Sequence, residues 1–504
     1  MEERYVVTAD LGTSKIAVCV ARMSGPDTEV LYYKEVESAG IRHGAIFNPS
    51  KAAEALRKAI ADAEGELGIK ITQLVAGLPR AGVRQEIGVG RNDRNDPSSC
   101  ITQEEIDDIK NFALDSYPLE DKERFTIYGG SAQSFSVDDM MNCTEDDVVG
   151  MPSSTIEGNF RVYVGRKAAK DNIDYMLNIL GIAPARYYFL PDSTADAVLT
   201  AEEKDNGTAL IEMGAGVTSL TIFQGGILRY YASIPFGGRN ITDDIKYECG
   251  FTDSLAENIK LGYGACMPEK LLSMSDKILR INDNESGNYQ DLPVKYLSEV
   301  ITCRVREIVD AILFKIQDSG FADRMRGGVV LTGGCANLTN CANLIKEMSG
   351  YNVRVGFPKL RTIIASDCPG IGEAGAASTV GMILKASKDS HLNCTGEYKP
   401  VRKASPVSEV EKELHTVSGT HAAADNIADE PEATFAPEED GTLFGPSPDK
   451  PARENSKKPE NRSHDAKKTH PSNPPKALTW FKKFVGAIED SAISDNFDKM
   501  IDNL

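Results

Sequence analysis

The sequence is poor in histidine, in paired cysteines and in long apolar runs, and each shortage excludes a class of protein. No apolar run reaches the roughly 18 residues that a membrane-spanning helix needs. The 10 cysteines are scattered from Cys19 to Cys394 without a CxxC pair, which disfavours a zinc site or a disulfide framework and predicts a reducing compartment. Only His43 and His391 lie in the part predicted to fold, so catalysis by a histidine is disfavoured.

Positive charge is also in short supply. The formal net charge is −19, so the phosphates of a nucleic acid would be repelled rather than neutralised. No nucleic-acid partner is therefore expected. The length of 504 residues allows a large core and more than one domain.

Strand-like apolar runs alternate with helical patterns from residue 5 to about 390, which predicts an α/β fold. The expected strands are RYVVTADLG, KIAVCVARM, FRVYVGRK, TALIEMGAG, TSLTIFQGG and GGVVLTGG. Helices are expected over PSKAAEALRKAIADAEGELG and over the long segment that starts at PVKYLSEV and ends at Gly320. Thr102 followed by Glu105 is the signature of a capping box at the start of a further helix.

Composition changes between Lys399 and Pro475. This span holds 11 of the 24 prolines, few aromatic residues and blocks of charge. Such a segment cannot bury enough apolar surface to offset its chain entropy, so a disordered linker is predicted.

Two segments share the order strand, acid, glycine-rich turn, strand. The first contains Asp10, Gly12, Thr13, Ser14 and Lys15, and the second contains Glu212, Gly214, Ala215 and Gly216. Glycines let backbone N–H groups approach phosphate oxygens, and an acid at the strand end can hold a hydrated Mg²⁺. One such turn alone is better explained as a simple β-hairpin. Two at corresponding positions, about 200 residues apart, favour a phosphate site.

Two further segments fit a nucleotide site, although each is weak evidence alone. A buried strand delivers Gly333 and Gly334 to an expected helix start near Asn337, where small residues would let a flat base lie against the backbone. Glu257 and Lys260 lie one helical turn apart and so share a face. A solvated ion pair is the alternative for these two residues.

The order of these segments resembles the actin and sugar-kinase superfamily, and over residues 5–395 the chain resembles the FtsA family of bacterial cell-division proteins. The stretches that carry the second resemblance include ESAGIRHGAIFNPSKAAEALRKAIADAE, PDSTADAVLTAEEKDNGTALIEMG and SIPFGGRNITDDI. The resemblance implies an actin-like two-lobed fold of duplicated ribonuclease-H-like halves that bind ATP and Mg²⁺. It implies nucleotide contacts at both turns, Gly238, Glu257, Lys260, Gly333, Gly334 and Asn337, with Asp10 and Glu212 holding Mg²⁺ through water.

The resemblance also implies domain boundaries. A first half would cover 1–80, an inserted SHS2-like subdomain 81–168, and the core of the second half 169–240. The smaller subdomain of the second half would cover 241–325, and 326–395 would complete the core with a last helix that returns to the first half. The linker would follow over 396–475, an amphipathic helix over 476–490 and an acidic end over 491–504.

Four departures from hydrolytic relatives predict at most a slow ATPase. The second turn has Glu212, Ala215 and Val217 where those relatives have aspartate, glycine and threonine. Leu190 stands where they have a water-positioning glutamate. Losing the group that orients the attacking water costs roughly 10²-fold or more in rate. The missing acid also argues against the alternative of a sugar or small-acid kinase.

The stretch TWFKKFVGAI near the end of the chain contains the only tryptophan. On a helical wheel one face gathers Leu478, Trp480, Phe481, Phe484, Val485 and Ile488, whereas Lys482 and Lys483 lie opposite. This pattern is typical of a helix that lies in the lipid headgroup layer, and docking on the protein's own surface or on a partner is the alternative. The helix argues against the other alternative, an actin-like pilus-assembly protein.

The family resemblance implies a scaffold rather than an enzyme. Such a protein forms filaments or oligomers on the cytoplasmic face of the inner membrane at the division site and ties the FtsZ ring to it. The FtsZ C-terminal peptide is expected on the smaller subdomain of the second half, at Lys295, Arg304 and Arg306, for which ordinary solvated helix charges are the alternative. Later division proteins are further expected partners.

Overall fold

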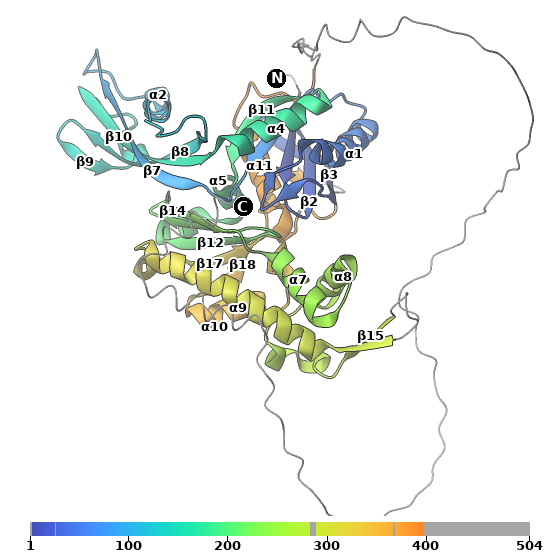
Figure 1. Cartoon of the computed structure of the whole chain (residues 1–504). Coiled ribbons are helices and arrows are strands. Elements are labelled where there is room, and N and C mark those ends of the chain that lie inside the picture. Colours follow the sequence, from blue (N-terminus) through green and yellow to red (C-terminus); the bar gives the residue numbers. More distant parts are fainter. Residues whose placement is uncertain (1–2, 26, 283–288, 366–367, 397–504) are drawn as a thin grey trace, which may run out of the picture. The chain divides into compact units, whose positions relative to one another are not determined.

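The computed structural model describes residues 3–25, 27–282, 289–365 and 368–396, all of which belong to one compact unit, Met1–Val401. Residues 397–504 lie outside the described residues. The predicted amphipathic helix, the acidic end and nearly all of the predicted linker fall in that part. The architecture of the described residues is α/β, as predicted (Figure 1).

The first sheet has six strands in the order β11-β6-β1-β2-β3-β19. Its strands are β1 (Arg4–Leu11), β2 (Lys15–Ser24), β3 (Asp27–Glu37), β6 (Gln73–Leu78), β11 (Ala183–Phe189) and β19 (Ile364–Ala365). The first three form an antiparallel meander, and β6 and β11 add on in parallel beside β1. Strand β1 is buried over most of its length, which explains its unbroken apolar run.

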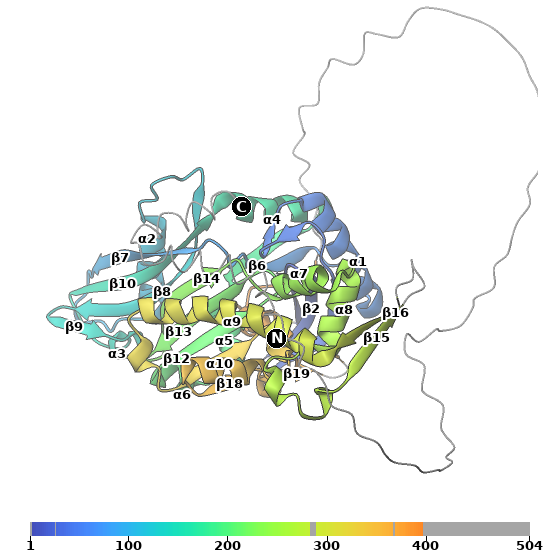
Figure 2. The same ribbon diagram turned by 60° about the horizontal axis from the view of Figure 1, so that its bottom comes forward.

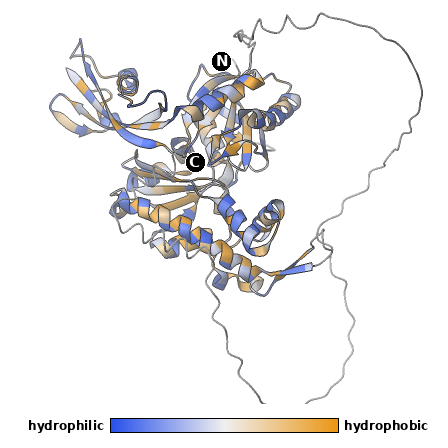
Figure 3. Cartoon of the chain, viewed as in Figure 1, coloured by the Kyte–Doolittle hydropathy of each residue, from blue (hydrophilic) through white to orange (hydrophobic). Residues whose placement is uncertain are grey.

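The second sheet repeats this plan. Its order is β14-β13-β12-β17-β18, built from β12 (Thr208–Met213), β13 (Thr218–Gln224), β14 (Ile227–Ile234), β17 (Gly328–Thr332) and β18 (Val353–Val355). Again three strands form an antiparallel meander, and two strands add on in parallel beside the first of them. The strands of both sheets are rich in hydrophobic residues (Figure 3). The two halves are therefore topological duplicates, each with a tight turn between its first two strands.

A separate four-stranded antiparallel sheet is inserted in the sequence between β6 and β11, two neighbouring strands of the first sheet. Its order is β7-β10-β8-β9, with β7 (Arg84–Asp93), β8 (Phe125–Val137), β9 (Met140–Cys143) and β10 (Thr155–Arg166). Helices α2 (Gln103–Asp115) and α3 (Glu145–Val148) accompany it. Its own core contains Phe135 and Phe160, whose rings meet edge to face. Thr102 and Glu105 form the predicted capping box at the start of α2.

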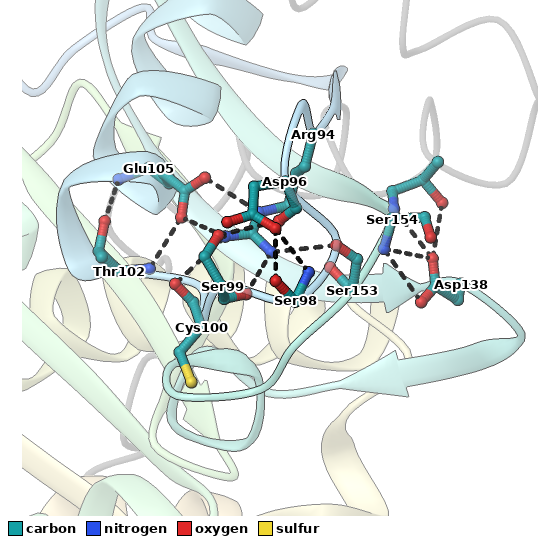
Figure 4. A network of polar contacts seen from close by, with 11 residues as sticks. Arg94, Asp96, Ser98, Ser99, Cys100, Thr102, Glu105, Asp138, Ser153 and Ser154 are labelled. Carbon is teal, nitrogen blue, oxygen red and sulfur yellow. Dashed lines mark hydrogen bonds and ion pairs between the residues drawn. The ribbon is translucent and has the colours of Figure 1, made fainter.

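Arg94, just after β7, ties together three segments of this inserted sheet (Figure 4). Its guanidinium forms an ion pair with Glu105 on α2, with Nε 3.0 Å from Oε1, and its side chain is only 4% exposed. It also donates to the carbonyl oxygens of Ser99, Cys100 and Ser153 at 2.7, 3.2 and 3.0 Å. One buried side chain therefore fixes the loop between β7 and α2 and the loop that leads into β10.

Replacing Arg94 with alanine should destabilise the inserted sheet. The change leaves a carboxylate and several carbonyl groups without their charged donor, which predicts a loss of about 3 kcal/mol in the free energy of unfolding. The hydrogen bond from Arg94, followed by that from the Thr102 backbone, lowers the pKa of Glu105 from 4.5, so this stabilisation is present above pH 4.5 and is lost as the pH falls through the folded-state value. Urea denaturation followed by circular dichroism, at neutral and acidic pH, measures both effects. A difference between wild type and variant that does not shrink in acid would contradict the assignment to Glu105.

Helices cover the first sheet in the positions that the sequence pattern requires. Helix α1 (Pro49–Leu67) begins after Asn48, whose side chain accepts from the Lys51 N–H, and ends at Gly68, where φ is +65°. It packs against β2, β3 and α4 (Lys167–Leu180). Helix α11 (Ala377–Ser387) packs against α5 (Leu190–Val198), β1 and β2, so a helix from the far end of the described chain lies on the first sheet.

The second half carries its own helices. They are α6 (Ala201–Asn206), α7 (Gly238–Cys249), α8 (Asp253–Tyr263), α9 (Val294–Asp318) and α10 (Cys341–Ser349). The long α9 packs against β13, β14 and α7 (Figure 2). Its C-cap is Ser319, one residue before the predicted end. Two short ribbons complete the described fold: β4 (Ile41–Arg42) with β5 (Ala45–Ile46), and β15 (Ile278–Asn282) with β16 (Tyr289–Pro293).

One predicted helix start was wrong. The residues after Gly333 form a single 3₁₀ turn over Gly334–Asn337, and the α-helix begins only at Cys341. Asn340, the residue before the helix, has φ of +63°, so the chain turns here before the helix can propagate. The strand therefore delivers its glycines to a tight turn rather than to an α-helix N-terminus.

Candidate functional site

The turns of the two duplicated meanders touch each other. A Cβ atom placed on Gly216 would lie only 2.6 Å from Oγ1 of Thr13, so glycine is needed for this approach. The Gly44 N–H donates to the same Thr13 oxygen at 2.9 Å, and Nδ1 of His43 lies 2.9 Å from the Gly216 carbonyl oxygen. Because a carbonyl only accepts, His43 donates this bond. The segment at residues 43–44 thus joins both turns.

The start of α7 docks onto the second turn. The N–H groups of Gly238 and Arg239 donate to the carbonyl oxygens of Gly214 and Ala215 at 2.9 and 2.7 Å. A Cβ on Gly237 would lie 2.3 Å from the Gly214 oxygen, so this contact also requires a glycine. The predicted site residue Gly238 is therefore beside the second turn, where it fixes the turn's backbone.

Lys260 on α8 is buried and fully occupied by protein acceptors. Its ammonium group donates to the Gly238 carbonyl oxygen at 3.0 Å, to Thr242 Oγ1 at 2.8 Å and to Glu257 Oε2 at 2.8 Å. The alternative of a solvated ion pair is wrong for Lys260, whose side chain is 8% exposed, whereas that of Glu257 is 33% exposed. Three donors meet three acceptors, so Lys260 anchors α7 to α8, and Glu257 is the more accessible of the two.

The third predicted segment also reaches this place. Gly333 has φ of +87°, and a Cβ there would lie 2.6 Å from the Met213 carbonyl oxygen at the end of β12. A Cβ on Gly334 would meet nothing within 4 Å, and both Gly334 and Asn337 are exposed. The backbone at Gly334 is therefore open to solvent near the second turn. Next to it, burial raises the pKa of the Cys335 thiol to about 12, which keeps that thiol protonated.

Asp10 and Glu212, the two acids near the strand ends, have an arginine between them. Arg80, two residues beyond the end of β6, lies between them, with Nη2 2.6 Å from Glu212 Oε1 and 4.0 Å from Asp10 Oδ2. Ser378 on α11 donates to the same Glu212 oxygen at 2.9 Å. Burial by itself lowers the pKa of Arg80, but Glu212 and Asp10 outweigh it and raise that pKa above the usual value. Arg80 therefore stays charged.

A magnesium ion shared by Asp10 and Glu212 does not fit this arrangement. The guanidinium of Arg80 already supplies a positive charge there, and one Glu212 oxygen already forms an ion pair with Arg80 and accepts a hydrogen bond from Ser378. Within the described residues, no group of three or more histidine, cysteine, aspartate or glutamate side chains is arranged to hold a metal ion. The predicted Mg²⁺ role of these two carboxylates is therefore not carried further.

Two other predicted site positions have protein partners. Lys15 forms an ion pair with Glu35, with Nζ 2.5 Å from Oε1, and the Tyr33 hydroxyl donates to the same carboxylate. Leu190 is 3% exposed, and a Cβ on Gly77 would lie 2.5 Å from its side chain. The place expected for a water-orienting acid is therefore filled by a packed aliphatic side chain, as the departure from hydrolytic relatives predicts.

The predicted peptide-binding residues differ in their surroundings. Arg304 forms a two-point ion pair with Asp244 on α7, with Nε and Nη2 at 2.5 and 2.8 Å from the carboxylate oxygens. Its Nη1 donates to Glu307 at 2.6 Å. Lys295 and Arg306 lie exposed on the same helix. Arg304 therefore braces α9 against α7, and its charge is already compensated.

The predicted membrane residues from Leu478 to Ile488 lie outside the described residues. Among the helices that are described, none combines the length and the apolar character needed to cross a bilayer.

Sequence reasoning missed four residues of this site: Arg80, His43, Ser378 and Gly237. One signal existed for Arg80, because it follows the carboxyl end of a strand parallel to β1, and ligands bind at that edge of such sheets. His43 and Ser378 come from segments whose meeting with the turns only the fold shows, whereas Gly237 directly precedes the predicted site residue Gly238.

The duplicated sheets, joined at their turns, have an actin-like fold. The chain is similar in structure to a chain of the solved structure titled "PilM-PilN type IV pilus biogenesis complex", with a TM-score of 0.53, 14% identity, and coverage of 76% of this chain and 98% of that chain. At this identity the similarity shows the fold alone, and the fold agrees with the predicted one.

The sequence comparisons point to one particular family. The family model described as "Cell division protein FtsA" matches residues 209–378. The FtsA of Neisseria meningitidis serogroup B is 27% identical over 363 residues, which cover 71% of this chain and 85% of that protein. The FtsA of Borreliella burgdorferi is 27% identical over 398 residues, covering 78% and 93%. The predicted resemblance to FtsA is thereby confirmed: the chain is similar to FtsA proteins over more than two thirds of its length.

Proposed function

We propose that this chain is an ATP-binding, actin-like scaffold of cell division that assembles on the cytoplasmic membrane and anchors the FtsZ ring. One observation carries the nucleotide part of the proposal. The glycine-rich turns of both halves meet at Thr13 and Gly216, beside the open backbone at Gly334. Backbone N–H groups from two turns can then converge on the same phosphate chain. The relation to proteins named for cell division supports the cellular part.

The experiment that tests the nucleotide part is direct titration of the purified full chain with a fluorescent ATP analogue. We expect saturable binding of the analogue and its displacement by unlabelled ATP. We do not expect a preference for a sugar or a small acid, as a kinase would show. No displacement by ATP at millimolar concentration would refute this part of the proposal.

Hydrolysis should be slow. Leu190 offers no oxygen to orient an attacking water, and the loss of such a group costs roughly 10²-fold or more. Phosphate release by the purified chain should therefore stay below about one turnover per second, including at saturating ATP. Steady release at several turnovers per second, without any partner, would show that another residue orients the water.

The membrane part of the proposal rests on the amphipathic pattern at residues 478–488. An interfacial helix buries only part of each large side chain, which is worth ~1.5–3 kcal/mol when fully buried. Ordering the segment on lipid costs part of that gain, so one copy binds weakly and reversibly. Several copies in one assembly bind more tightly through effective concentration. A filament or oligomer is therefore the proposed working form on the membrane.

The FtsZ peptide is proposed to bind on α9, with Lys295 and Arg306 as its charged contacts and Arg304 as the brace beneath them. Reversing Lys295 and Arg306 together to glutamate should weaken binding of an acidic FtsZ C-terminal peptide at least about tenfold, with little change in thermal stability. Arg304→Ala should instead lower the melting temperature, because Asp244 and Glu307 lose their partner. Fluorescence anisotropy and thermal unfolding separate the two effects.

The control for this pair is Arg326→Glu, a charge reversal of an exposed arginine outside α9 that changes the net charge by half as much as the pair does. It should leave peptide binding unchanged. If the Lys295→Glu/Arg306→Glu variant also binds the peptide normally, the surface is misassigned.

A further inference from the structure

Three charged side chains from separate segments converge at the base of the two turns. Asp10 lies near the end of β1 in the first half, and Glu212 lies near the end of β12 in the second half. Arg80 extends between them from the segment after β6. The exposed fractions of these side chains are 14%, 11% and 15%, and Nη2 of Arg80 lies 2.6 Å from Glu212 and 4.0 Å from Asp10. The cluster is therefore largely shielded from solvent, and its charges act strongly on one another.

Arg80 is held in this position by both ends of the residue. Its Nη2 donates to Ser378 Oγ at 2.5 Å, and Ser378 in turn donates to Glu212. Its carbonyl oxygen accepts from the Tyr231 hydroxyl at 2.5 Å. Contacts with α11, β12 and β14 therefore hold Arg80 in one defined position, unlike an arginine on the surface.

The cluster keeps unused polar atoms. Nε of Arg80, Oδ1 of Asp10 and Oε2 of Glu212 are buried and have no hydrogen-bond partner. Buried polar atoms are nearly always paired, so one donor and two acceptors mark a place for a polar ligand. The donor suits a phosphate oxygen, and the acceptors suit water or a hydroxyl group.

We propose that Arg80 is a built-in cation that takes the electrostatic place of Mg²⁺ between the acids of the two halves. Its charge compensates the two carboxylates, so the protein does not recruit a divalent cation at this point, and Nε remains as a donor toward a phosphate. The inference rests on the proposed nucleotide site and concerns one property of it, the dependence of nucleotide binding on Mg²⁺. Two carboxylates without a cationic partner would create that dependence, and Arg80 suppresses it.

Magnesium binding to the nucleotide-free full chain tests the inference without relying on nucleotide. In wild type, the melting temperature in about 10 mM MgCl₂ should equal that in NaCl of the same ionic strength. Arg80→Gln should lower the melting temperature, because two carboxylates remain without their partner, and MgCl₂ should then raise it by several degrees more than NaCl does. Arg80→Lys keeps the charge and should respond to Mg²⁺ as wild type does.

Two further variants keep the outcome decisive. Arg80→Gln/Glu212→Gln removes one charge of each sign and should recover much of the lost stability without a response to Mg²⁺. Arg326→Gln, an exposed arginine elsewhere, should behave as wild type. The inference is overturned if Mg²⁺ stabilises wild type as much as it stabilises Arg80→Gln.

The nucleotide arm compares affinity for the fluorescent ATP analogue in MgCl₂ and in EDTA. The ratio of the two affinities should be at least about tenfold larger for Arg80→Gln than for wild type. Equal ratios would contradict the inference, whereas absence of ATP binding by wild type under both conditions would refute the proposed function. In that event the nucleotide-free measurement still decides whether Arg80 excludes Mg²⁺.

Discussion

Trp480→Glu should leave the full chain in the supernatant when it is sedimented with vesicles that contain anionic lipid, whereas wild type should sediment with them. Trp480 belongs to the apolar face proposed for residues 478–488. A carboxylate there would have to enter the headgroup layer, and the loss of the indole also removes the largest apolar contribution. Near-complete loss of sedimentation is expected, because the free energy with which one helix binds the lipid surface is small.

The matched control is Thr479→Glu, which adds the same charge one residue away but on the polar face. It should reduce sedimentation only modestly, through the added negative charge near anionic lipid. Both variants should bind the ATP analogue as wild type does. If Trp480→Glu and wild type sediment equally, the segment has another role, such as docking on a protein surface.

Gly216→Val should abolish nucleotide binding while the sheets remain folded. A Cβ at this position would already lie 2.6 Å from Thr13 Oγ1, and valine adds two methyl groups to that conflict. The two turns must then separate, and their N–H groups can no longer converge on one phosphate chain. We expect at least a roughly hundredfold loss of affinity in the fluorescent titration, a cost of about 2.7 kcal/mol.

Gly65→Val provides the control for that substitution. Gly65 lies on an exposed part of α1, and a Cβ there would meet nothing within 4 Å. This variant should bind nucleotide normally. Unchanged affinity in Gly216→Val would mean that the meeting of the two turns is not the binding site.

Much of the fold could be predicted from the sequence because its signals are local. The apolar runs of β1 and β12 are long and buried, the capping box at Thr102 fixes the start of α2, and the pattern of α9 runs to within one residue of its cap at Ser319. The wrong prediction of a helix start near Asn337 also came from a local signal. A strand followed by two glycines leads as readily into a 3₁₀ turn as into an α-helix.

The glycines of the site could be predicted, but the pairing of its charges could not. Repetition of one turn pattern in both halves is visible in the sequence, and the structure brings Thr13 and Gly216 together. Arg80 and Ser378 hydrogen-bond across 298 residues, and Arg304 and Asp244 across 60. A single sequence gives no sign of which distant acid compensates which base, so Arg304 and Lys260 looked available to ligands although the protein itself uses their charges.

The most direct test of the whole account is the position of a fluorescent fusion of the full chain in dividing cells, compared with the same fusion lacking residues 476–504. A nucleotide-dependent scaffold attached through its C-terminal helix should form a band at mid-cell that the truncation disperses. A diffuse signal from both proteins would contradict the account.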